Sequence, residues 1–100
     1  MANMTQHRKA LILRVVDGTA TTSTQDRRSA FEGQGPAAAR GLIEKVTRHA
    51  YKVTDEDIAA AKAAGLSEDA IFELVVSAAV GEADRQIESA LAALEEAAKV

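Results

Sequence analysis

The stretch VTDEDIAAAKAAGLSEDAIFELVV, residues 53–76, decides the fold. It predicts a helix, a sharp turn and a second helix, because a capping residue followed by acids stands at the start of each half. The Thr54 hydroxyl can accept a hydrogen bond from the backbone N–H of Asp57, and Ser67 can cap the second helix in the same way. Gly65 suits the left-handed conformation that ends many helices, so we expect the turn there.

The second helix is apolar around most of its circumference between Ile71 and Val80. At about 100° per residue, its polar residues share one narrow stripe, which we interpret as facing water. The members of this polar stripe are Asp69, Glu73, Ser77 and Asp84. Leu66 before the cap and Ile71 after it have the spacing of a hydrophobic staple.

Beyond Gly81 only one side of this helix continues as apolar. That side carries Ala83, Ile87, Ala90 and Leu94. We therefore expect the helix to be central up to about Gly81 and one-sided afterwards.

Shorter helices are expected earlier in the chain. Thr5 can cap a first helix that stops at Gly18, although the segment LILRVV (11–16) is also β-prone, so a strand remains an alternative. Ser23 or Thr24 can cap the segment QDRRSAFE (25–32), which ends at Gly33. Pro36 suits the start of a further helix, residues 37–52.

The composition indicates one all-α domain of 100 residues. We divide it into N-terminal helices and a connector (1–35) and a helical core (36–98). There is no cysteine, which excludes disulfides and thiolate chemistry, and only three residues are aromatic. Many alanines imply close helices and a thin core, which favours self-association. No long apolar run is present, so we expect a cytoplasmic protein without a membrane span.

Charge is distributed unevenly between the two halves. Residues 1–50 hold eight Lys/Arg and four Asp/Glu (net +4), whereas residues 51–100 hold four and eleven (net −7), giving the total of −3. Because the total is acidic and the basic groups lack aromatic neighbours, we do not expect nucleic-acid binding. The basic pair at 27–28 is interpreted as part of a solvated face.

A single 100-residue chain has few elements with which to cover a helix that is apolar all round. The other large apolar residues can cover two of its sides. We expect a second copy of the protein to cover the rest, which predicts a homo-oligomer, most simply a two-fold dimer.

The segment KVTRHAYKVTDEDIAAAKAAGLSEDAIFELVVSAAVGEADRQIESAL (45–91) resembles the carboxymuconolactone decarboxylase and alkylhydroperoxidase D-like superfamily. The resemblance extends over roughly residues 37–95 and implies an all-helical fold that forms dimers, trimers or hexamers. Peroxidase-type members carry a Cys-x-x-Cys pair with a histidine four residues after the second cysteine. Counted back from His49, those positions hold Leu42 and Lys45, so the resemblance implies a member without redox cysteines or one of the decarboxylase-like branch.

Two residues are candidates for acid–base catalysis. His49 lies at the edge of the apolar face of the 37–52 helix, where a general base can be half-buried. Glu73 on the apolar helix is a candidate buried acid with a raised pKa. The alternatives are a boundary histidine and a solvent-facing glutamate. Arg85 is expected either in a surface or intersubunit ion pair or on a small anionic ligand.

We expect neither a metal nor a cofactor, because His7 and His49 lack ligand spacing and no phosphate-binding loop is present. The leading hypothesis is a non-catalytic structural or interaction module. The alternative is a cysteine-independent acid–base enzyme of the decarboxylase or lactone type, in which His49 and Glu73 act on a small organic acid.

Overall fold

The computed structural model describes residues 2–99 as an all-helical chain, with side-chain surroundings from Met4 onward. The α-helices are α1 (Ala2–Asp17), α2 (Thr24–Phe31), α3 (Arg40–His49), α4 (Asp55–Ala63) and α5 (Glu68–Ala98). Two short 3-10 helices, η1 (Ala37–Ala39) and η2 (Ala50–Lys52), flank α3. Residues 2–99 contain no strand, so the all-α prediction is confirmed and the strand alternative for residues 11–16 is wrong.

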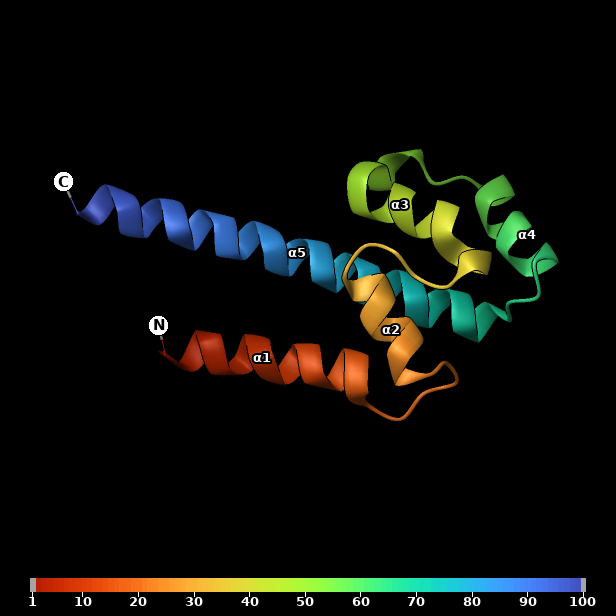
Figure 1. The fold of residues 1–100 in the computed structure, drawn as a ribbon, viewed down its shortest axis with the longest axis horizontal. Coiled ribbons are helices and arrows are strands. Elements are labelled where there is room, and N and C mark those ends of the chain that lie inside the picture. The colour runs from red at the N-terminus through yellow and green to blue at the C-terminus, as the bar shows by residue number, and fades with distance from the viewer. Residues whose placement is uncertain (1, 100) are drawn as a thin grey trace.

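Helix α5 is the axis of the fold (Figure 1). Its first half is surrounded by α2, α3 and α4, and its second half runs beside α1 in the opposite direction. The described chain is elongated, with extents of 53 × 29 × 17 Å. The buried positions of α5 end at Gly81, which confirms that the helix is central only up to that residue.

The core is thin, and half of its buried hydrophobic residues are alanine. One cluster joins α2, η1, α3 and α5 through Ala30, Ala39, Ile43, Leu74 and Ala78. A second cluster consists of Leu42, Ala61 and Ile71, and Leu66 packs against it, as the staple spacing predicts. Each buried Leu or Ile contributes about 2 kcal/mol, whereas alanine contributes mainly by allowing close helix approach.

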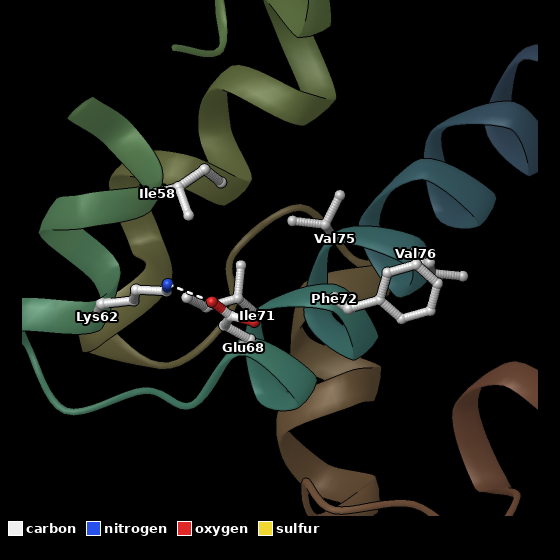
Figure 2. A pocket seen from close by; sticks show the side chains of 7 residues that line it. All are labelled: Ile58, Lys62, Glu68, Ile71, Phe72, Val75 and Val76. Atoms are coloured by element: carbon white, nitrogen blue, oxygen red, sulfur yellow. Dashed lines mark hydrogen bonds and ion pairs between the residues drawn. The ribbon is translucent and has the colours of Figure 1, made fainter. Parts of the chain in front are cut away.

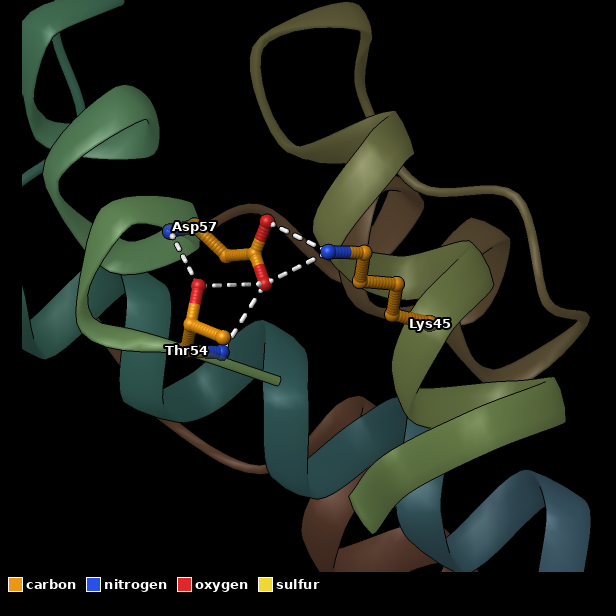
Figure 3. A network of polar contacts seen from close by, with 3 residues as sticks. All are labelled: Lys45, Thr54 and Asp57. Atoms are coloured by element: carbon orange, nitrogen blue, oxygen red, sulfur yellow. Dashed lines mark hydrogen bonds and ion pairs between the residues drawn. The ribbon is translucent and has the colours of Figure 1, made fainter. Parts of the chain in front are cut away.

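The predicted caps are present at both helix starts. Thr54 Oγ1 accepts a hydrogen bond from the Asp57 backbone N–H, and Asp57 Oδ2 accepts one from the Thr54 backbone N–H at 2.9 Å, which completes a capping box (Figure 3). Lys45 Nζ donates to both oxygens of Asp57 at 2.9 Å and so ties α3 to the start of α4. Ser67 caps α5 through the Ala70 N–H, and Gly65 has a φ of +104°.

Two predicted boundaries are wrong. Thr5 lies inside α1, which begins at Ala2, so Thr5 is not its cap. The expected single helix over residues 37–52 is divided into η1, α3 and η2. Pro36 stands at the start of η1 rather than of an α-helix, and the tighter 3-10 geometry covers the first three residues.

Candidate functional site

Glu73 binds the connector between α1 and α2. Its Oε1 accepts hydrogen bonds from the backbone N–H and the hydroxyl of Thr22, both at 2.7 Å. Its Oε2 accepts a third from the Thr21 backbone N–H at 2.9 Å. The carboxylate is therefore satisfied within the chain, and it fixes a connector that precedes it by about fifty residues.

These hydrogen bonds determine the protonation state of Glu73. Partial burial raises the pKa of Glu73, but the hydrogen bonds from Thr21 and Thr22 outweigh this effect and lower the pKa from 4.5 to about 2. A buried general acid requires a raised pKa, so the lowered pKa of Glu73 is opposite to that requirement. At neutral pH the group is an anion that accepts three hydrogen bonds.

His49 lies at the other end of the candidate pair and is exposed at the last residue of α3. Its ring meets that of Tyr51 edge-on, with centroids 6.1 Å apart and planes at 84°. Among the contacts of residues 2–99, none joins His49 to a carboxylate or to Glu73. The two candidates thus have separate surroundings, and no third group orients the imidazole.

The remainder of the polar stripe faces protein rather than water, apart from the exposed Asp69. Ser77 is fully buried, and its hydroxyl donates to the Glu73 carbonyl oxygen at 2.8 Å. Asp84 Oδ1 lies 2.9 Å from Arg8 Nε, and Arg8 also pairs with Glu88. The solvent-facing interpretation holds for Asp69 and is wrong for Ser77, which is buried, and for Glu73 and Asp84, which the connector and α1 partly cover.

The arginines stabilise helix ends. Arg85 Nη1 donates to the Phe31 carbonyl oxygen at 2.7 Å, and Arg85 Nη2 pairs with Glu82 at 3.0 Å, so its ion pair lies within the chain. Arg27 is 3% exposed, and its Nη1 donates to the Val15 carbonyl oxygen at 3.0 Å near the end of α1. The solvated-face interpretation is therefore wrong for Arg27. No local signal in the sequence indicates this burial, because it depends on the contact with α1.

An open apolar hollow of about 300 Å³ lies between α4 and α5 (Figure 2). Its lining residues are Ile58, Lys62, Glu68, Ile71, Phe72, Val75 and Val76. An ion pair between Lys62 and Glu68 closes one end. Phe72 is 69% exposed, so the prediction that the apolar segment 71–80 is not fully covered by this chain holds at Phe72.

Apolar residues form a line along α5, which we call the α5 stripe. Its members are Phe72, Val76, Ala79, Ala83, Ile87, Ala90, Leu94 and Ala97. Steps of three and four residues keep them on one side of the helix. All are exposed except Val76, which is half-buried, and the exposed fraction is 69% at Phe72, 64% at Leu94 and 41% at Ile87.

Within residues 2–99, no group of three or more His, Asp or Glu side chains is arranged to hold a metal ion. None of the described helices combines the length and apolar composition needed to cross a bilayer. Comparisons with protein-family models, with curated proteins and with solved structures gave no match.

Proposed function

We propose that this chain is a non-catalytic structural or interaction module that acts by associating with further copies of itself. The observation that carries the proposal is the exposed α5 stripe, which continues for seven steps along a single helix. An uncovered apolar side chain such as Phe72, at 69% exposure, is stabilised when a partner removes it from water.

The thin core supports the same proposal. Half of the ten buried hydrophobic residues in the described part of the chain are alanine, so the core contributes modestly for a 100-residue chain. Association that buries part of the stripe adds apolar contact that the single chain lacks. A closed two-fold dimer is the simplest assembly in which the same surface serves both copies.

The test is sedimentation of the purified chain over a concentration series. We expect a dimer at micromolar concentration, and a monomer throughout would overturn the proposal. Ala90→Glu places a charge on the stripe, whereas Ala92→Glu places the same charge on the far side of the same exposed turn. We expect Ala90→Glu to dissociate the dimer and Ala92→Glu to leave it intact.

The acid–base alternative has less support. It requires His49 and Glu73 to act together on a small organic acid, yet the two share no contact among those of residues 2–99. A carboxylate with a pKa of about 2 is a poor proton donor at neutral pH. Turnover of a lactone or a β-keto acid that disappears in His49→Ala would restore this alternative.

A further inference from the structure

We propose that α1 and the second half of α5 (residues 82–98), together called the arm, pack against the arm of a second copy to form a four-helix bundle. The two-fold axis runs parallel to the arm helices. This inference rests on the self-association proposed above, and it adds the surface, the partner and the orientation.

The arm has one open apolar side. Two hollows of about 200 and 90 Å³ follow the junction between α1 and α5. From α1 they expose Met4 (72%) and Leu11 (52%), and from α5 they expose Ile87 (41%). In Figure 1 the two helices extend side by side beyond the rest of the fold, so neither has a further helix of this chain to cover it.

The α5 stripe continues along the open side of the arm. From Phe72 to Ala97 it advances 25 residues in seven steps, or about 3.6 residues per step, so it stays straight along the helix for ~38 Å. Two antiparallel helices with one shared apolar side are half of a four-helix bundle. A second identical pair completes the bundle and covers the open side of both arms.

Charge identifies the occupant as a second copy. Helix α1 carries Arg8, Lys9 and Arg14 against Asp17, a net charge of +2. Residues 82–99 carry five acids against Arg85 and Lys99, a net charge of −3. Each arm therefore contains both a basic and an acidic helix, so two arms can be complementary to each other.

The same charges select the orientation. Two flat helix pairs can stack in two symmetric ways. A two-fold axis parallel to the helices places each α1 over the partner's α5. A two-fold axis perpendicular to the helices places α1 over the partner's α1 and α5 over the partner's α5. Both arrangements make all neighbouring helices antiparallel, but only the first sets basic against acidic helices.

The first experiment uses two matched leucines of α1. Leu11 lies on the open side at 52% exposure, and Leu13 lies about 200° around the helix at 56%. We expect Leu11→Asp to raise the dimer dissociation constant at least about tenfold, or ~1.4 kcal/mol, and Leu13→Asp to leave it unchanged. Equal dissociation constants for the two variants would overturn the arm as the interface. Circular dichroism checks that both variants keep their helix content.

The second experiment tests the orientation through single cysteines in a chain that has none of its own. Leu94→Cys lies on the stripe, and Glu96→Cys points to the opposite side of the same turn. With the axis along the helices, the two thiols introduced by Leu94→Cys face each other across the bundle. With the axis across them near Ile87, these thiols are ~20 Å apart along the bundle.

A bismaleimide linker shorter than this ~20 Å separation between the thiols should cross-link most of the Leu94→Cys dimer and little of the Glu96→Cys dimer. The arm proposal is contradicted if a chain that sediments as a dimer gives equal yields of cross-linked product from the two variants, or no product from either. Self-association would still stand in that case. A wild-type chain that sediments as a monomer would overturn both.

Discussion

Gly81 of α5 lies directly against the main-chain carbonyl of Phe31, the last residue of α2. A Cβ at position 81 would be 1.9 Å from that oxygen and 2.7 Å from its carbon. Because both atoms belong to backbone, neither can move away without shifting the helix. The glycine therefore sets the distance between the two helices, and Arg85 donates to the same oxygen one turn later.

We predict that Gly81→Ala destabilises the fold by about 2–3 kcal/mol, because overpacking at a rigid contact outweighs the gain of about 1 kcal/mol in helix propensity. Gly41 in α3 is the matched control, since a Cβ there meets nothing within 4 Å. Gly41→Ala should stabilise the fold by about 0.5–1 kcal/mol. Urea unfolding followed by circular dichroism measures both, and equal effects of the two substitutions would contradict the role of the Phe31 contact.

A second prediction concerns the connector held by Glu73. Glu73→Gln keeps the shape of the side chain but removes its charge, so the N–H groups of Thr21 and Thr22 lose an anionic acceptor. We expect a loss of about 1–2 kcal/mol in the free energy of unfolding near neutral pH. Thermal or urea unfolding gives the value, and an unchanged stability would show that the connector does not need the carboxylate.

The pH dependence of this effect follows from the lowered pKa. Glu73 has a folded-state pKa of about 2 against an ordinary value of 4.5, so the stability that it contributes is fully present above pH 4.5. That contribution is lost as the pH falls from 4.5 through 2, because the unfolded state takes up the proton in this range while the folded state does not, and the loss is complete once the folded state is protonated as well. The stability difference between wild type and Glu73→Gln should narrow over this range, and a constant difference would be evidence against the three hydrogen bonds.

Adjacent arginines in α2 give a third prediction. Arg27 is buried and donates to the Val15 carbonyl oxygen, so Arg27→Ala should cost about 2–3 kcal/mol by leaving a cavity and an unpaired acceptor. Arg28 forms a partly exposed ion pair with Asp17 at 3.0 Å, and Arg28→Ala should cost less than about 1 kcal/mol. The two substitutions are at adjacent positions of the same helix, and thermal unfolding compares the stability that each one removes.

The capping box at α4 gives a fourth prediction. Thr54→Ala removes the hydroxyl that accepts from the Asp57 N–H and should cost about 1 kcal/mol. Thr54→Ser keeps the hydroxyl and should retain most of the stability. Amide hydrogen exchange at residues 55–57 provides the local measurement, and faster exchange in the alanine variant alone is the expected result.

The features that could be predicted from the sequence are those whose cause is local. The caps at Thr54 and Ser67 and the left-handed Gly65 each depend on residues within a few positions. The loss of apolar character on one side of α5 after Gly81 could also be predicted, because it depends on the residue pattern of a single helix.

The features that could not be predicted depend on residues distant in the chain. Glu73 binds a connector 51 and 52 residues earlier, so nothing beside it in the sequence indicates a lowered pKa. Ser77 and Arg27 are buried because other helices cover them, although polar residue type alone favours exposure. His49 lies on a helix edge that periodicity identified, but its separation from Glu73 became apparent only in three dimensions.

The bond between Glu73 and the connector also orders events during synthesis. The first helix and its connector leave the ribosome well before Glu73 has been made, so at that stage they can form their contacts with α2 but lack the hydrogen bonds to Glu73. Their docking against α5 therefore waits until Glu73 has been made. A chain that stalls before that point exposes a basic helix able to bind whatever acidic surface it meets first.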